Sequence, residues 1–266
     1  MLFLSVLTYR FIEQPCRNPK RVGTRQLLSV LGTGFVLLNV GALYVYLRAG
    51  VVRDIPELGI SKSQVTRNMH AAYNSRILSY DHAFLHQDKT RVLVIGDSFA
   101  RDWVNVLLES NFRDDLEISY VEHADVHPEL KKRADEAQII FYASRSGEGG
   151  NKPGLPLSKL WVIGTKNFGK SNGIFYNHRG RDYHEQRTQM EEGYFETNQA
   201  MRREWAQRYI DLIGKVIDSN REVPVFTPSQ KFISQDCRHF TKAGAQYFAQ
   251  ALEIEIANIL KGVGVP

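Results

Sequence analysis

The stretch 91–103, RVLVIGDSFARDW, decides the fold. Residues 91–95 are mostly β-branched or aliphatic, which is the composition of a buried parallel strand. Residues 96–98, Gly-Asp-Ser, then predict a sharp turn, and apolar residues recur at helical spacing over 99–109. A strand that turns directly into a helix places Ser98 at the carboxyl edge of a sheet, where open α/β folds carry their chemistry.

Ser98 allows two interpretations from this stretch alone. The backbone N–H groups of Ser98 and Phe99 are expected to be unpaired donors at a helix N-terminus, and such donors can stabilise an oxyanion. Ser98 would then be a nucleophile. Alternatively, Ser98 is a turn residue whose side chain caps the helix.

The rest of the sequence continues the alternation of strands and helices. The segments 144–158 and 166–186 are rich in Gly and polar residues and are predicted to be loops. Strands alternating with helices predict an α/β fold with a parallel sheet of about five strands flanked by helices. Further strands are predicted over 117–121, 138–143, 160–165 and 222–227, and helices over 128–137, 198–219 and 241–260.

The segment 26–47, QLLSVLGTGFVLLNVGALYVYL, has 22 residues and no charge. A helix needs about 20 mostly apolar residues to cross a bilayer, so we expect one transmembrane helix here. A core helix would show a polar face, and a cleavable signal peptide would have a shorter apolar run and a small-residue cleavage site. The segment matches neither alternative.

Basic residues are concentrated before this helix. The 266 residues carry a formal net charge of +5, of which residues 1–25 supply +4. No basic face for nucleic acid is therefore predicted. Because positive residues flank the cytoplasmic side of membrane helices, we expect a single-pass protein of the bacterial inner membrane, with its amino end cytoplasmic and the rest periplasmic.

The expected organisation has four parts. Residues 1–25 are the remnant of a membrane helix and a basic cytoplasmic loop, in which Pro15 and Pro19 are expected to interrupt any helix. The transmembrane helix 26–47 and a periplasmic linker over 48–90 follow, and 91–266 is the catalytic domain.

A base for Ser98 is offered by the segment Asp236-Cys237-Arg238-His239. A serine hydroxyl needs a base, and a third group must orient that base. An aspartate three residues before a histidine can reach the imidazole Nδ1–H and leave Nε2 to face the serine. The alternative is a surface turn that caps the helix beginning near Thr241.

GDSF at 96–99 and DCRHFTKAGA at 236–245 resemble the two end blocks of the SGNH/GDSL hydrolase superfamily. The resemblance implies a flavodoxin-like parallel sheet, with Ser98 as the nucleophile and Asp236 and His239 as the other triad members. The superfamily's GxND block, whose asparagine donates to the oxyanion, is absent after the third predicted strand. The oxyanion donors are therefore assigned to the amides of Ser98 and Phe99, with Asn167 as a substitute for the missing asparagine.

TYRFIEQPCRNPKR at 8–21, followed by one membrane helix, resembles the end of the acyltransferase-3 family. In its fused members, a last membrane helix leads into a periplasmic SGNH domain that O-acetylates surface polysaccharide. The resemblance implies a cell-envelope polysaccharide such as lipopolysaccharide or exopolysaccharide as acceptor, and no bound cofactor. Acetyl groups would come ultimately from acetyl-CoA through a membrane acyltransferase. In the fused family members, the transmembrane acyltransferase part would precede the residue that corresponds to Met1. The chain is therefore interpreted as a fragment or as a protein that needs a separately encoded membrane partner.

Neither cysteines nor histidines predict a metal site. Cys16 and Cys237 flank the apolar segment, so no disulfide is expected. The pairs His82/His86 and His123/His127 have helical ligand spacing but no obvious third ligand. Six aromatic residues either line a sugar-binding groove or pack a loop onto the sheet: Phe168, Phe175, Tyr176, Tyr183, Tyr194 and Phe195.

Three functions remain open from the sequence. The first is an acyltransferase with a serine acyl-enzyme, the second is a carbohydrate esterase that uses water as the acceptor, and the third is an inactive fragment that at most binds glycan. The glycan, its acylated hydroxyl and the substrate-binding residues are unassigned.

Overall fold

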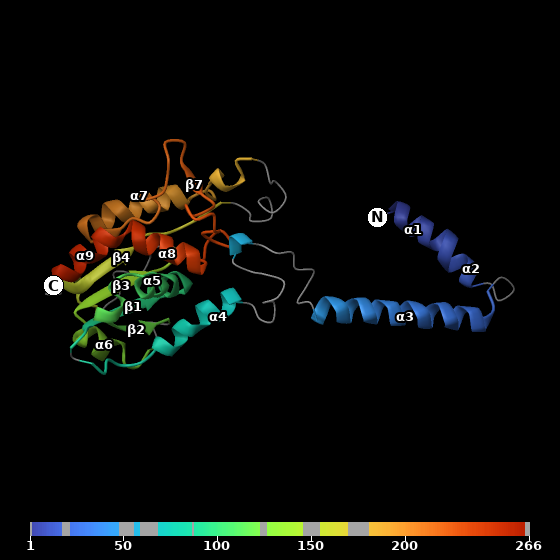
Figure 1. Cartoon of the computed structure of the whole chain (residues 1–266), viewed down its shortest axis with the longest axis horizontal. Coiled ribbons are helices and arrows are strands. Elements are labelled where there is room, and N and C mark those ends of the chain that lie inside the picture. The colour runs from blue at the N-terminus through green and yellow to red at the C-terminus, as the bar shows by residue number, and fades with distance from the viewer. Residues whose placement is uncertain are drawn as a thin grey trace. The chain divides into compact units, whose positions relative to one another are not determined.

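A computed structural model describes residues 2–17, 22–47, 56–58, 69–86, 88–122, 127–145, 155–169 and 181–263. The chain divides into two compact units. The first contains the described residues up to Leu47, and the second contains those from Pro56 onward (Figure 1).

The first unit is helical. It comprises α1 (Leu2–Thr8), a π-helical turn over Tyr9–Glu13, α2 (Gln14–Cys16) and α3 (Thr24–Leu47). The expected interruption at Pro15 is wrong, because the helix continues to Cys16. The Gln14 N–H bonds to the Tyr9 carbonyl in the π turn, and this wider bonding accommodates a proline that has no N–H of its own. Pro19 lies outside the described residues.

The helix predicted over 26–47 is confirmed as α3. Its stretch Thr24–Val45 is 22 residues long, is apolar enough to cross a bilayer, and is not buried against the rest of the described chain. By length and composition, α3 is therefore a candidate membrane span.

The second unit is built on a parallel five-stranded sheet in the order β2–β1–β3–β4–β6, of which Figure 1 labels the first four strands. This is the flavodoxin-like order, which confirms the predicted fold class, and its switch point lies between β1 and β3. The strands are β1 (Thr90–Gly96), β2 (Leu116–Val121), β3 (Ile139–Ala143), β4 (Leu160–Ile163) and β6 (Tyr209–Ile210).

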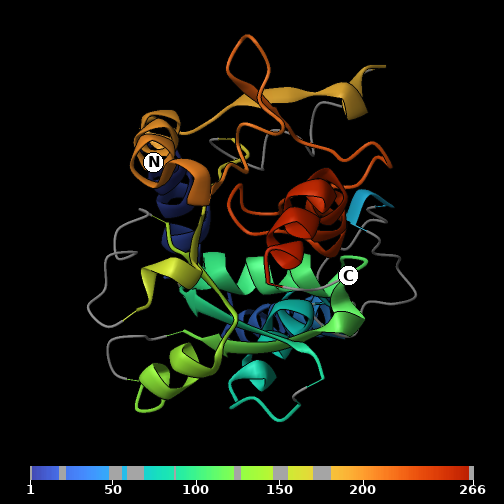
Figure 2. The ribbon, with the colours of Figure 1, turned by 90° about the vertical axis from the view of Figure 1, so that its left-hand side faces the viewer.

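Alternating side chains of β1 serve the two faces of the sheet. Val92 and Val94 belong to the larger apolar core, which also contains residues of α5 (Ser98–Leu108), α8 (Lys242–Ala251) and α9 (Glu253–Lys261). Leu93 and Ile95 face the smaller core with α6 (Leu130–Glu136). Figure 2 shows α6 on one side of the sheet and α5, α8 and α9 on the other.

Part of the segment before β1 packs on α5. It forms α4 (Met69–Ser75) and a 3-10 turn over Arg76–Tyr80. The Asn105 amide donates to Asn74 at 3.0 Å, and Arg76 pairs with Glu109 at 3.2 Å. The fully buried Ile77 joins the larger core, so these residues form part of the same folded unit as the sheet.

The single helix predicted over 198–219 is wrong. Helix α7 (Tyr194–Trp205) ends where Ala206 has φ 46°, and Tyr209–Ile210 then form β6 beside β4. The following apolar residues are buried in turns, one of which is closed by the Gly214 N–H bonding to Asp211 Oδ1 at 2.7 Å. Their spacing imitates a helix because turns also bury every third or fourth residue.

The strand predicted over 222–227 exists only as β7 (Glu222–Pro224), and it is not in the main sheet. It pairs antiparallel with β5 (Arg187–Gln189) in a separate two-stranded sheet. Pro224 lacks an N–H, which suits a short edge strand better than a central one. The closing helix predicted over 241–260 is two helices, α8 and α9, because Leu252 between them has non-helical dihedrals.

Gly96, the last residue of β1, requires glycine for two reasons. Its φ is +135°, which residues with a side chain rarely adopt. A Cβ placed there would lie 1.8 Å from the Ala143 carbonyl oxygen on β3. The turn after β1 therefore depends on the close approach of two strand backbones.

We expect Gly96→Ala to destabilise the protein severely, because β1 and β3 would have to separate. Gly193→Ala is the matched control: Gly193 also has positive φ (+86°), but no atom lies within 4 Å of its would-be Cβ. The control should cost only about 1–2 kcal/mol. Thermal unfolding followed by circular dichroism measures both, and equal losses of stability would contradict the backbone-contact explanation.

Candidate active site

Ser98 is the first residue of α5 and directly follows the turn after β1. Asp97 is the helix N-cap, and its Oδ1 accepts the Phe99 N–H at 2.8 Å. The Tyr120 hydroxyl of β2 donates to the Gly96 carbonyl at 3.3 Å and so ties the turn to the neighbouring strand. The Ser98 side chain is thus left to contact another segment.

That segment is the loop containing Asp236 and His239. Asp236 Oδ1 accepts the backbone N–H groups of Arg238 and His239 at 3.0 and 2.8 Å, which closes a tight turn. Cys237, between Asp236 and Arg238, has φ 66°, a left-handed conformation that lets the chain fold back within three residues. The other carboxylate oxygen, Oδ2, lies 2.5 Å from His239 Nδ1.

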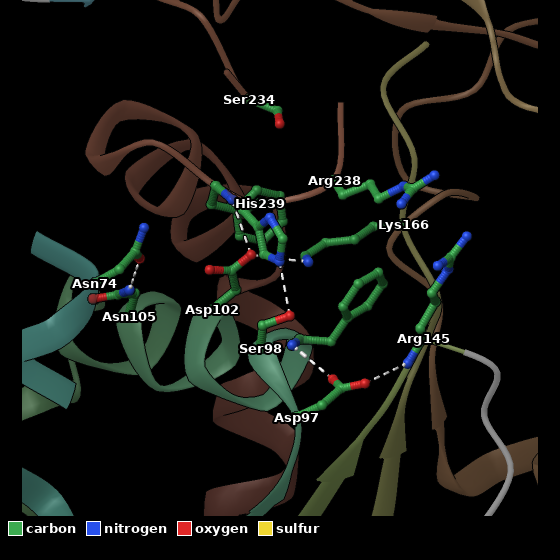
Figure 3. A network of polar contacts seen from close by, with 12 residues as sticks. Asn74, Asp97, Ser98, Asp102, Asn105, Arg145, Lys166, Ser234, Arg238 and His239 are labelled. Carbon is green, nitrogen blue, oxygen red and sulfur yellow. Dashed lines mark hydrogen bonds and ion pairs between the residues drawn. The ribbon is translucent and has the colours of Figure 1, made fainter. Parts of the chain in front are cut away.

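The structure brings the three predicted triad residues together (Figure 3). His239 Nε2 lies 2.7 Å from Ser98 Oγ, across 141 residues of sequence. With Nδ1 directed at Asp236, a neutral imidazole in this arrangement carries its proton on Nδ1 and presents the Nε2 lone pair to the serine. The geometry can thus take a proton from Ser98.

The Asp236 carboxylate is stabilised in its charged form. Burial acts to raise its pKa, but the bonds from the His239 side chain and from the His239 and Arg238 amides outweigh burial and lower the pKa. Asp236 therefore stays ionised through the neutral range, and its orienting effect on His239 is lost only at strongly acidic pH.

The alternative interpretations as helix caps are wrong for both segments. The cap of α5 is Asp97 rather than Ser98. The cap of α8 is Thr241, whose Oγ1 accepts the Gly244 N–H at 3.0 Å, rather than Asp236. Ser98 and Asp236 are bonded to His239 instead.

The expectation of two unpaired amides at the start of α5 is half wrong. The Phe99 N–H is taken by Asp97, because an aspartate directly before a helix satisfies one of its first donors. The Ser98 N–H has no partner within the described chain and stays available to an oxyanion.

Asn167, the predicted substitute donor, is fully buried in the loop after β4. Its Oδ1 accepts the N–H groups of Gly169 and Glu191 at 3.0 and 2.9 Å, so the side chain joins two segments. Its Nδ2 is buried without a hydrogen-bond partner among the described residues.

Several charged residues at the site were not identified from the sequence. Asp97 Oδ2 accepts the backbone N–H of Arg145 at 3.2 Å, which ties the end of β3 to the turn. Arg238 pairs with Glu191 at 2.7 Å, and Asp102 forms a buried ion pair with Lys166. Two of these residues could have been identified from the sequence. Asp97 stands where a helix N-cap is expected, and Asp102 is the one acidic residue of the largely apolar helix FARDWVNVLL.

A polar cavity adjoins this site through Glu191. Its volume is about 360 Å³. Phe195 lies in its wall with the Arg221 guanidinium 4.4 Å above the ring centroid. The remaining lining residues are Gln189, Met190, Glu191, Glu192, Gly193, Glu196 and Asn220.

Most described aromatics of 168–195 pack in the interior instead of lining a groove. Phe168 lies 5.8 Å from the rings of both Phe240 and Phe248, and Tyr183 lies 4.9 Å from Phe226. Tyr194 is buried as well. Phe175 and Tyr176 lie outside the described residues.

The histidine pairs form no cluster with a third ligand in the described parts of the chain. His82 Nδ1 contacts the Ala83 carbonyl, the His86 amide bonds to Glu117, and His127 Nε2 lies 3.2 Å from Asp81. His123 lies outside the described residues. Neither cysteine forms a disulfide bond within the described chain; Cys16 is exposed and Cys237 is buried.

A scan against protein-family models finds no match to the sequence, and a search of curated proteins finds none either. Among solved structures, the chain is similar to the periplasmic domain of the lipopolysaccharide acetyltransferase of Salmonella ser. Paratyphi A. The TM-score is 0.47 with 10% sequence identity, covering 73% of this chain and 98% of that chain. Similarity at this level does not bear on function, and the fold is defined by the strand order.

Cys237, next to the triad, is expected to be unreactive in the folded protein. Burial, with the nearby Asp236 and Glu191 charges, raises the pKa of its thiol to about 11. At pH 8 its thiolate fraction is then about 10²-fold below that of an ordinary cysteine. In a Cys16→Ser background, alkylation by iodoacetamide should be slow and should accelerate only toward pH 11. Equal rates in folded and denatured protein at pH 8 would contradict the burial of this thiol.

Proposed function

We propose that this protein is a membrane-anchored periplasmic acyltransferase that moves an acetyl group to a hydroxyl of a cell-envelope polysaccharide through an acyl-Ser98 intermediate. The observation that carries the chemistry is the contact of His239 Nε2 with Ser98 Oγ at 2.7 Å, with Asp236 on the other imidazole nitrogen. A serine, a base and an orienting carboxylate in this order suit acyl transfer.

In the first half-reaction, Ser98 Oγ attacks the acyl carbonyl while its proton moves to His239 Nε2. Asp236 stabilises the imidazolium that forms. The Ser98 N–H donates to the oxyanion, and the unpartnered Nδ2 of Asn167 is a candidate for a second donor. When the carbonyl reforms, the leaving group departs with the proton from Nε2, and the acyl group stays on Ser98.

In the second half-reaction, Nε2 takes the proton of the acceptor hydroxyl as its oxygen attacks the acyl carbonyl. Collapse of the intermediate returns that proton to Ser98 and releases the acylated acceptor. No cofactor is needed for either half. The donor would be an acetyl carrier supplied by a membrane acyltransferase, ultimately from acetyl-CoA, as the sequence resemblance implies.

The acceptor and the location rest on further features. The FIEQP segment and the apolar α3 support anchoring in the inner membrane, and the basic residues before α3 support a cytoplasmic amino end. The cavity beside Glu191 supports a polyhydroxylated acceptor, because its carboxylates, Asn220 and Arg221 can bind sugar hydroxyls.

A carbohydrate esterase is the second candidate. It is favoured by the solvent access of the triad, in which the side chain of His239 is 24% exposed and that of Asp236 is 52% exposed. Water, and not only a glycan hydroxyl, can therefore approach the acyl group on Ser98.

A serine-directed fluorophosphonate should label Ser98 of the full-length protein in detergent. His239→Ala should slow labelling by about 10²–10⁴-fold, because the base is removed. His82→Ala is the control. The His82 ring stacks on Tyr80 and bonds to the Ala83 carbonyl, and neither residue touches the triad, so the rate should be unchanged. Mass spectrometry of the labelled peptide locates the adduct. Equal labelling of both variants, or none of the wild type, would exclude the triad mechanism.

Acetyl partition separates the two candidate functions. With an activated acetyl ester as donor and an envelope polysaccharide as acceptor, the proposed transferase should put most acetyl groups on the glycan. Ser98→Ala gives the uncatalysed blank. Release of free acetate at the same rate with and without glycan would identify the esterase instead.

A further inference from the structure

A fully buried ion pair lies beside the triad and takes no part in the proton transfers described above. Lys166 Nζ is 2.9 Å from Asp102 Oδ2, and their side chains are 1% and 0% exposed (Figure 3). Removing two charges from water is costly, and well-packed apolar residues often replace such pairs without loss of stability. The pair is therefore poorly explained by stability alone.

Asp102 connects the two halves of the triad. It lies on α5 four residues after Ser98, so both residues share one face of the helix. Its Oδ2 also accepts the backbone N–H of Phe240, the residue after His239, at 2.9 Å. One carboxylate oxygen thus joins the helix that begins with Ser98 to the loop that carries His239.

Lys166 brings in a third segment, the loop after β4. Its ammonium lies 3.5 Å from the ring centroid of Phe99 and 5.1 Å from that of Phe240, the residues that follow Ser98 and His239. Burial lowers the Lys166 pKa, and the Asp102 carboxylate opposes that shift. Because the ammonium is enclosed, it acts through these neighbours instead of on a substrate.

The same loop is attached to the histidine loop by a second bond. The Phe168 N–H donates to the Cys237 carbonyl at 2.7 Å. The histidine loop is therefore held from α5 by Asp102 and from the loop after β4 by this backbone bond. Within the loop itself, Asp236 orients the imidazole ring but does not place the ring over Ser98.

We propose that Asp102 is a positioning residue, which holds His239 over Ser98 by accepting the Phe240 N–H, and that Lys166 pairs with the buried carboxylate and keeps it directed at that N–H. The role of Asp102 in placing the histidine loop rests on these contacts and does not depend on the proposed function. Its consequence for catalysis rests on the proposed function, in which His239 activates Ser98.

Two double variants of the full chain, in detergent, test this role. D102N/K166M removes both charges but keeps an oxygen that accepts the Phe240 N–H. D102L/K166M has the same number and branching of side-chain heavy atoms as D102N/K166M, but it is bulkier and has no acceptor. Hydrogen exchange over 236–241 reports the order of the loop without any need for activity, and fluorophosphonate labelling reports the Ser98–His239 contact.

In D102L/K166M we expect the loop amides to exchange at least about tenfold faster than in the wild type, with β1 unchanged. Labelling of Ser98 should slow by on the order of 10²-fold, because a small displacement of a catalytic group has that effect. D102N/K166M should retain loop protection and label within about tenfold of the wild type. This rescue by the conservative variant is not expected from loss of packing.

The control variant removes another pair with a buried member. Arg133, 4% exposed, pairs with Asp81 at 2.7 Å and makes no contact with the triad. R133M/D81N should leave both readouts unchanged. If D102N/K166M and D102L/K166M show the same loop exchange and the same labelling rate, the positioning role is overturned. If D102L/K166M does not fold, D102A/K166M removes the acceptor without adding volume and is judged by the same comparison.

The two proposals fail in different ways. If the wild type is not labelled at Ser98, the acyl-transfer function falls, while loop exchange in the variants still decides the role of Asp102. If the wild type is labelled and the loop exchange is the same in all variants, only the positioning role falls.

Discussion

The site depends on one backbone constraint, the close approach of β1 and β3 at Gly96. A side chain there would overlap the Ala143 carbonyl, so the chain turns at a residue that has none. The turn lies at the switch point of the sheet, where neighbouring connections leave in opposite directions and open a crevice. Asp97 then bonds both the start of α5 and the Arg145 amide after β3. The position of Ser98 is thus defined by backbone atoms of two adjacent strands.

Sequence patterns that are local and continuous predicted much of this arrangement. The run of residues 91–103 gave β1, the turn and α5 nearly at their observed bounds, because one strand buried on both faces and one amphipathic helix carry strong periodic signals. The spacing of Asp236 and His239 predicted their mutual contact, since a three-residue turn is a local property. The contact of His239 with Ser98 was expected from the resemblance to SGNH hydrolases. The strand before the histidine loop, β7, lies outside the main sheet, so the order of the strands alone does not bring these two residues together.

What the sequence did not predict depends on contacts between distant segments. Strand β6 is two residues long, and only its pairing with β4 distinguishes it from the turns around it. The Asp102–Lys166 pair joins α5 to the loop after β4, and nothing in either segment alone indicates its partner. The Phe99 amide is a different case. Aspartate is a preferred helix cap, so its capture by Asp97 was available from the sequence and was missed.

The charges around the site show why an imidazole is the group left to act as base. Three carboxylates surround Ser98 and His239, and each is engaged by N–H donors of the protein. Asp97 accepts two backbone amides, Asp102 accepts one amide and pairs with Lys166, and Asp236 accepts two amides and the imidazole. For Asp236 these bonds lower the pKa of the carboxyl group, which makes it a poor proton acceptor. In all three aspartates they fix the carboxylate in place, so that it ties one segment to another. The aspartates therefore set geometry and field, while Nε2 of His239 faces the hydroxyl of Ser98 with a lone pair that no other described residue occupies.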